Sequence, residues 1–236
     1  MLENLYQKPN QPKLVIRVAD PGLEELLSLL LQEWRYQVAL DPDEETTLLG
    51  EEGVCDPTPF QRAIWLNHSS YSSQGRLQIP FTIEELYSLL ERRFHRPPRR
   101  HLRLAAELPA RLEHGGKTWD TVISSLSDQG CRISIPEELV RGEHVKISFE
   151  VAGVRQQCES RVIYSMQRRP SPSDERFAIG LLFGHQTSQD RQFLRDFITS
   201  SYLLRVKQKM SDQNFQAGIQ SIRLSAGVHS ALDADT

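Results

Sequence analysis

The hydrophobic pattern of the first 95 residues switches between strand-like runs and helix-like spacing. An apolar run at 14–18 predicts a buried strand, and Asp20-Pro21-Gly22 predicts the turn that ends it. Between residues 23 and 34, leucines recur at helical spacing while glutamates keep to the other side, which predicts an amphipathic helix. Further strands are predicted by the short runs at 37–40, 63–66 and 76–79.

A second helix should follow the last of these strands. Thr82 is a favourable N-cap, and Glu84 and Glu85 would lie at the positive end of the helix dipole. Strands that alternate with helices favour an α/β unit built on a parallel sheet, with helices on both faces. Residues 1–95 are therefore predicted to form a small, three-layered α/β domain.

The pattern changes after the proline-interrupted segment 95–100, which cannot continue a helix. Short runs that alternate apolar with polar residues and are separated by glycine turns then predict an antiparallel β-barrel. These runs cover residues 101–113, 121–127, 130–135, 144–151, 155–165 and 177–184. A helix beginning near Thr187 should present Phe193, Leu194, Phe197 and Ile198 to the barrel.

Residues beyond about Lys209 are polar and show little periodicity, which is typical of a mobile tail. The domain organisation predicted is an α/β domain at 1–95, a barrel domain at 96–205 and a flexible tail at 206–236. The fold class is thus α/β plus β.

Charge is distributed unevenly along the chain. Residues 1–95 carry 8 Lys+Arg against 15 Asp+Glu, whereas residues 96–236 carry 20 against 16, so an anionic ligand fits the second half better. The three cysteines lack the spacing of a disulfide framework or a zinc site, and no apolar run is long enough for a membrane span. Motifs of catalytic and cofactor sites are also missing from the sequence, so we expect no enzyme, catalytic residue, metal or cofactor.

The N-terminal half resembles the receiver domains of response regulators. The resemblance lies in the opening LVIRVADPGLEELL and the closing RLQIPFTIEELYSLLERRF, in which a Pro-Phe pair precedes an acidic helix start. The family's acidic pair would fall on Val18 and Ala19, its lysine on Ile79, and its phosphoryl-accepting aspartate on Asn67 at the third predicted strand. Phosphoryl transfer depends on these charges, so the resemblance implies a degenerate receiver. An unrelated small α/β domain is the alternative.

Two short segments carry candidate binding chemistry. Arg99, Arg100 and Arg103 lie on the basic arm before the barrel, and guanidinium groups bind phosphates in bidentate fashion and stack on purines. Ser125, Ser127 and Gly130 belong to a turn between two predicted strands, where hydroxyl groups and backbone N–H groups can approach a ligand closely. Taken singly, the first segment reads as a solvated linker and the second as an ordinary turn.

Together these segments resemble the PilZ domain family over about residues 96–202. The family's RxxxR motif falls on Arg99 and Arg103, with Arg100 adjacent, and its second motif falls on Ser125, Ser127 and Gly130. Ser125 departs from the family pattern, which has Asp or Asn at that position. The lost polar contact would weaken binding by about 1–3 kcal/mol.

The resemblance implies a bacterial, cytoplasmic receptor for cyclic di-GMP that works without catalysis. Clamping of the arm on the ligand would reorient the two domains and alter the contact with a protein partner that the sequence does not identify. A homodimer is a further candidate assembly; nucleic acid and membrane insertion are not expected, given the acidic net charge of -3. The alternative is a PilZ-type adaptor that contacts proteins without ligand, which the Ser125 departure permits.

Overall fold

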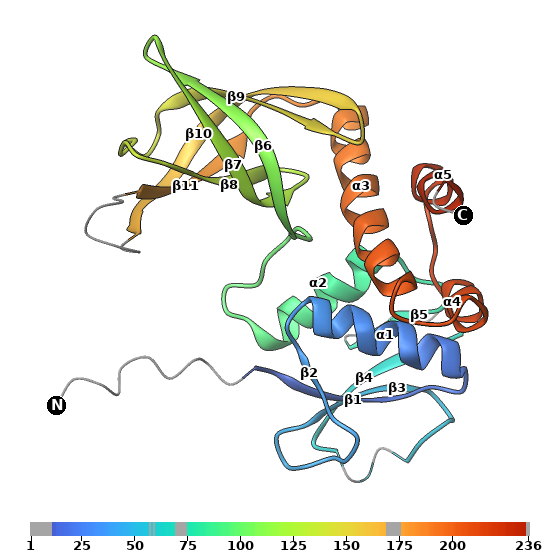
Figure 1. The fold of residues 1–236 in the computed structure, drawn as a ribbon. Helices are drawn as coiled ribbons and strands as arrows, with labels where there is room; N and C mark the ends of the chain where they lie inside the picture. Colours follow the sequence, from blue (N-terminus) through green and yellow to red (C-terminus); the bar gives the residue numbers. More distant parts are fainter. Residues whose placement is uncertain (1–10, 57, 59, 69–74, 169–175, 235–236) are drawn as a thin grey trace, which may run out of the picture. The chain divides into compact units, whose positions relative to one another are not determined.

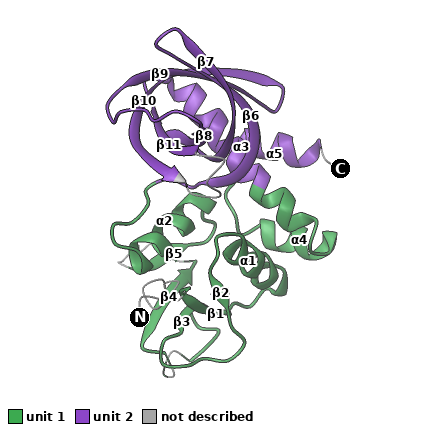
Figure 2. Cartoon of the chain, turned by 60° about the vertical axis from the view of Figure 1, so that its left-hand side comes forward, with its two compact units in different colours: residues 1–100, 202–225 green, residues 101–201, 226–236 purple. Residues whose placement is uncertain are grey.

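The structure, a computed structural model, describes residues 11–56, 58, 60–68, 75–168 and 176–234. These residues form two compact units, coloured separately in Figure 2. Unit 1 contains residues 1–100 and 202–225, and unit 2 contains residues 101–201 and 226–236. The first division lies close to the predicted boundary at 95/96, but the chain returns to each unit a second time, which the prediction did not include.

Unit 1 is built on a five-stranded, all-parallel sheet with the order β2-β1-β3-β4-β5 (Figure 1). Its strands are β1 (Lys13–Arg17), β2 (Gln37–Val38), β3 (Thr47–Glu51), β4 (Arg62–Asn67) and β5 (Arg76–Gln78). The sheet confirms the parallel α/β architecture predicted for this half of the chain.

Two helices of the alternating pattern begin at strong capping residues. In α1 (Pro21–Glu33), the N-cap Asp20 accepts a hydrogen bond from the Leu23 N–H at 2.8 Å. In α2 (Ile83–Phe94), Thr82 and Glu85 form a reciprocal capping box. The leucines of the predicted amphipathic faces are buried in both helices, so periodicity and capping chemistry located these elements correctly.

Strand β3 was not predicted from the sequence pattern, and its presence changes the numbering of the strands that follow it in unit 1. Thr47-Leu48-Leu49 is a short run flanked by acidic residues, yet it forms the centre of the sheet and its side chains are fully buried. The position assigned to Asn67 was therefore wrong, because Asn67 ends the fourth strand and Glu51 ends the third. The similarity to receiver domains stays a prediction.

The expectation of helices on both faces of the sheet was also wrong. Figure 1 shows α1 and α2 on one side of the strands. The described residues of the connections 39–46, 52–61 and 68–75 are all non-helical. In the described part of these connections no helix covers the second face of the sheet.

The described residues 206–234 are largely helical, in contrast to the flexible tail predicted for 206–236. Helix α3 (Ser188–Lys207) runs on past residue 205, and α4 (Asp212–Ile219) and α5 (Ala226–Asp233) follow it. The prediction failed because these helices bury only a few apolar residues each, so their periodicity is weak. Asn214 Nδ2 donates to Glu25 at 2.7 Å, which attaches α4 to α1 within unit 1.

Helices α1 and α4 approach closely at a pair of glycines. A Cβ atom added at Gly218 would lie 2.6 Å from the carbonyl oxygen of Gly22, well inside van der Waals contact. We expect Gly218→Val to lower the free energy of unfolding by about 2 kcal/mol, because the helices must move apart. Thermal unfolding checks this against Gln216→Ala, an exposed change on the same helix; equal melting temperatures for the two variants would mean that α4 is not packed in unit 1.

Unit 2 is a closed six-stranded barrel with the order β10-β11-β8-β7-β6-β9 (Figure 1), which confirms the predicted antiparallel barrel. Its strands are β6 (Leu104–His114), β7 (Lys117–Ser127), β8 (Gly130–Ile135), β9 (His144–Val151), β10 (Val154–Arg168) and β11 (Arg176–Phe183). Alternate residues face inward and are fully buried, among them Ile123, Ile133 and Ile147. This alternation in the sequence is what made the strands predictable.

Helix α3 begins, as predicted, at a Thr187–Asp190 cap in unit 2. The Thr187 hydroxyl accepts from the Asp190 N–H, and the Asp190 carboxylate accepts from the Thr187 N–H, both at 3.1 Å. The last residues of the helix belong to unit 1, where the ring of Tyr202 packs edge-on against Trp34 at 6.1 Å. Burial raises the pKa of Tyr202 to about 12. One helix therefore has residues in both units.

Candidate functional site

Arg103 projects from the start of the barrel because its neighbours are anchored in the core. Leu102 and Leu104 are buried, and the exposed Arg103 lies between them. Leu104 pairs with Leu126 and Ala105 pairs with Ser125 in the antiparallel ladder of β6 and β7. Since side chains alternate along a strand, Arg103, Ala105 and Ser125 all lie on the outer face of the barrel. The structure thus brings residues of the two predicted motifs together.

The second motif forms the tight turn between β7 and β8. Ser127 pairs with Gly130 across the turn, and the Ser127 hydroxyl donates to the Gly130 carbonyl oxygen at 3.1 Å. The same hydroxyl accepts a weak hydrogen bond from the Gln129 N–H at 3.4 Å. Ser127 is buried, so in this structure its hydroxyl stabilises the turn, in the manner of a serine turn.

Gly130 has a packing role that is independent of any ligand. A Cβ atom at this position would lie 2.1 Å from the carbonyl oxygen of Leu181 on the neighbouring strand β11. The φ of Gly130 is not in the left-handed region, so its backbone conformation does not require glycine. Glycine is required because β8 and β11 approach closely at this position.

The other two arginines of the arm, Arg99 and Arg100, are exposed and belong to unit 1. The Arg99 N–H donates to the buried Glu91 carboxylate at 3.0 Å. Burial and the nearby Glu91 raise the pKa of Tyr87, and a hydrogen bond from the Arg99 side chain opposes that shift. Arg99 is therefore held against α2 by both its backbone and its side chain.

A buried carboxylate at the turn was missed as a functional candidate. Asp128 is only 3% exposed, and its two oxygens contact His101 Nδ1 at 2.9 Å and Arg195 Nε at 2.7 Å. Arg195 Nε donates a hydrogen bond to the carboxylate, and the His101 ring lies at ion-pair distance from its other oxygen. Asp128 thus connects the arm to α3 inside unit 2. Its position between Ser127 and Gln129 was visible in the sequence, but its partners are distant in the chain.

Arg132 was also missed, and it lies directly opposite Ser125 in the ladder of β7 and β8. Its Nε donates to the Ser124 hydroxyl at 3.0 Å, and that hydroxyl donates back to the Arg132 carbonyl oxygen at 3.3 Å. These reciprocal contacts fix the root of the guanidinium group on the outer face of the barrel.

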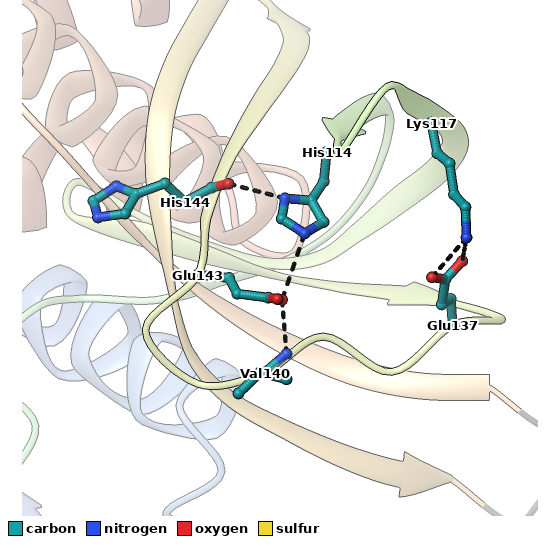
Figure 3. Close-up of polar contacts among 6 residues, drawn as sticks. All are labelled: His114, Lys117, Glu137, Val140, Glu143 and His144. Atoms are coloured by element: carbon teal, nitrogen blue, oxygen red, sulfur yellow. Dashed lines mark hydrogen bonds and ion pairs between the residues drawn. The ribbon is translucent and has the colours of Figure 1, made fainter.

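A polar hollow of about 420 Å³ lies at the other end of the β6–β7 hairpin, away from the two motifs. Figure 3 shows its surroundings: His114 Nδ1 lies 3.0 Å from the His144 carbonyl oxygen, and Lys117 Nζ contacts Glu137 at 2.9 Å. Two of its basic residues lie beside carboxylates: His114 is 3.6 Å from Glu143, and Lys117 pairs with Glu137. None of the site residues predicted from the sequence lines it.

Comparison with known protein families decides the identity of this barrel. The sequence model of the PilZ domain matches residues 92–200, a range that includes the arm, all six strands of the barrel and most of α3. Residues 92–200 form a PilZ domain. The motif residues Arg99, Arg103, Ser125, Ser127 and Gly130 all fall within this PilZ domain.

The chain is also similar to several solved structures at low sequence identity. The inhibitor of motility MotI/DgrA of Bacillus subtilis is 18% identical over 45% of this chain and 52% of its own, with a TM-score of 0.39. MrkH of K. pneumonia is 19% identical over 46% and 51%, with a TM-score of 0.40. The PilZ domain of Escherichia coli YcgR, solved with c-di-GMP, is 15% identical over 47% and 95%, with a TM-score of 0.38. The match therefore spans about half of MotI and of MrkH, and no curated protein matches the chain.

Among the described residues, no cluster of His, Cys, Asp and Glu side chains has the arrangement of a metal site. In the same part of the chain, none of the helices is both long and apolar enough to span a membrane.

Proposed function

We propose that this chain is a bacterial, cytoplasmic cyclic di-GMP receptor that acts without catalysis. The observation that carries the proposal is the convergence of Arg103 and Ser125 on one outer face of a PilZ domain. An exposed arginine beside small polar residues suits a flat, anionic nucleotide, because the guanidinium fork binds phosphate and the small residues leave space for a base.

In the proposed complex the three arginines bind the phosphate groups. Arg103 makes the contact from the start of the barrel, while Arg99 and Arg100 contribute from the segment between α2 and β6. Charge-assisted hydrogen bonds of this kind contribute about 1.5–3 kcal/mol each, and salt weakens those that stay near solvent. Arg99 must exchange its hydrogen bond to Tyr87 for one to the ligand.

Ser125, Ser127 and Gly130 have different parts in this proposal. Ser125 offers one hydroxyl to a guanine edge, with shorter reach than the Asp or Asn usual in the family. The Ser127 hydroxyl and Gly130 stabilise the turn and the strand contact described above, so they shape the site.

The proposed output is a change in the relative orientation of the two units, which a protein partner would detect. Ligand capture by the arm would pull on His101, which is bonded to Asp128, and Asp128 is bonded to Arg195 of α3. Helix α3 continues into unit 1, so a displacement on the barrel side has a continuous route to the other unit.

Arg103→Ala is expected to weaken cyclic di-GMP binding about 10- to 100-fold, since one charged hydrogen-bonding group is removed from an exposed position. Isothermal titration of the purified full chain checks this. Arg155→Ala is the matched control, because it removes an equally positive, exposed arginine from β10 of the same barrel. Its affinity should stay within twofold of the unmodified chain.

The same titration distinguishes the receptor from the ligand-independent adaptor. If the unmodified chain gives no saturable heat with cyclic di-GMP at high concentration, the receptor proposal is wrong and the adaptor is favoured. Binding that Arg103→Ala leaves unchanged would show that the nucleotide occupies another surface.

A further inference from the structure

A continuous row of five residues crosses the outer face of the barrel beside Arg103. The ladder pairs Ala105 with Ser125, Ser125 with Arg132, Arg132 with Gly180 and Gly180 with Tyr164. Residues opposite one another in a ladder point to the same face. Three members of the row are small, so they leave a shallow floor with an arginine in it and an aromatic ring at one end.

A β-bulge places Tyr164 on this face. The register of β10 against β11 shifts between Val162 and Tyr164, so that one extra residue, Ile163, is inserted. Val162 is buried in the core, and without the bulge strict alternation would point Tyr164 inward as well. Bulges frequently redirect a side chain beside a functional site.

The Tyr164 ring lies over the backbone of Gly180. A Cβ atom at Gly180 would be 2.2 Å from Cε1 and 2.6 Å from Cζ of the ring, so only glycine leaves space for it. Gly180 separates Tyr164 from Arg132 in the row, and the ring is therefore directed toward Arg132. Because Tyr164 is only half-buried, the ring keeps a surface on which a flat ligand can stack.

Within the part of the chain that the structure describes, Arg132 is oriented by a hydroxyl group and forms no ion pair with a carboxylate. Ser124 binds its Nε at 3.0 Å, which leaves the edge formed by the two terminal nitrogens for a ligand, and Ser125 stands across the strand where the family usually has Asp or Asn. A carboxylate at that position would pair directly with Arg132. Because Ser125 stands in place of the usual Asp or Asn, the guanidinium group of Arg132 is available to bind a ligand, which an ion pair across the strands would prevent.

We propose that Tyr164 and Arg132 form a guanine subsite: the base stacks on the Tyr164 ring, and Arg132 donates two hydrogen bonds to guanine O6 and N7. This inference rests on the proposed cyclic di-GMP function. Arginine pairs with O6 and N7 in bidentate fashion, and adenine lacks that match because its N6 amino group is a donor. Stacking, in contrast, accepts either purine. Tyr164 thus supplies affinity, and Arg132 supplies selectivity for guanine.

The test is titration of the full chain with cyclic di-GMP and cyclic di-AMP. Tyr164→Ala should weaken both ligands by a similar factor of about 10, whereas Tyr164→Phe keeps the ring and should bind as the unmodified chain does. Arg132→Met should weaken cyclic di-GMP about 10-fold or more and change cyclic di-AMP little, so that the preference for guanine falls. Met166→Ala, an exposed change two residues along β10 from Tyr164, is the control.

The outcomes separate this inference from the proposed function. If the unmodified chain binds cyclic di-GMP and Arg103→Ala abolishes binding, but Tyr164→Ala and Arg132→Met bind normally, the guanine subsite is wrong and the receptor stands. If the unmodified chain does not bind at all, the receptor fails and takes the subsite with it. Equal loss of both ligands in Arg132→Met would overturn the selectivity role, and circular dichroism verifies that each variant is folded.

Discussion

Asp128→Ala is expected to lower the free energy of unfolding of the barrel unit by about 3 kcal/mol. The substitution removes the charge-assisted hydrogen bond from Arg195 and the contact with His101 from a carboxylate that is only 3% exposed. The cost is limited because His101 and Arg195 keep 32% and 44% of their side-chain surface exposed and can be rehydrated. The melting temperature should fall by roughly 10–20 °C, as measured by circular dichroism.

Asp120→Ala is the matched control for this prediction. Asp120 also pairs with an arginine, Arg111, but its side chain is 82% exposed, and exposed ion pairs contribute at most about 1 kcal/mol. Asp128→Asn should fall between the two, since it keeps the volume and one acceptor. If Asp128→Ala and Asp120→Ala have the same melting temperature, the contacts of Asp128 with His101 and Arg195 contribute nothing to stability. The proposed route from the arm to α3 then loses its support.

Gly130→Ala is expected to destabilise the barrel by about 3 kcal/mol, with or without ligand. The added methyl group would lie 2.1 Å from the Leu181 carbonyl oxygen, so β8 and β11 must separate. Gly115→Ala is a useful comparison, because Gly115 has a φ of +57° but open space around it. That change should cost only about 1 kcal/mol of backbone strain.

Denaturant unfolding of the two glycine variants, each with and without cyclic di-GMP, checks the comparison. Equal stability of Gly130→Ala and the unmodified chain, combined with lost affinity, would contradict the packing role. It would mean that Gly130 acts on the ligand directly.

Local sequence patterns predicted those elements of the fold in which the environment of each residue depends mainly on its neighbours in the sequence. Alternation located the strands of the barrel, and the capping residues Asp20 and Thr82 located α1 and α2. The arm and the turn were recognisable because each motif is short and continuous. Their convergence followed from the strand order, which places Ala105 opposite Ser125.

The features that escaped prediction depend on contacts between distant segments. Strand β3 is apolar only at Leu48 and Leu49, and its burial comes from the strands on either side. Asp128 meets Arg195 across 67 positions of the chain. The sequence around the bulge that turns Tyr164 outward alternates as in a regular strand. The bulge therefore has no local sequence pattern from which it could be predicted. Each of these requires the pairing of strands and helices to be known first.

The interleaving of the two units restricts how the protein can be divided. A fragment cut at residue 205 would lose α4 from unit 1, and a fragment limited to 92–200 would end inside α3 and lack α5. Neither unit is a contiguous stretch that recombination could move intact to another protein. Gene fusion or truncation should therefore keep the two units together, and proteolytic cleavage near residue 100 should leave both fragments incomplete.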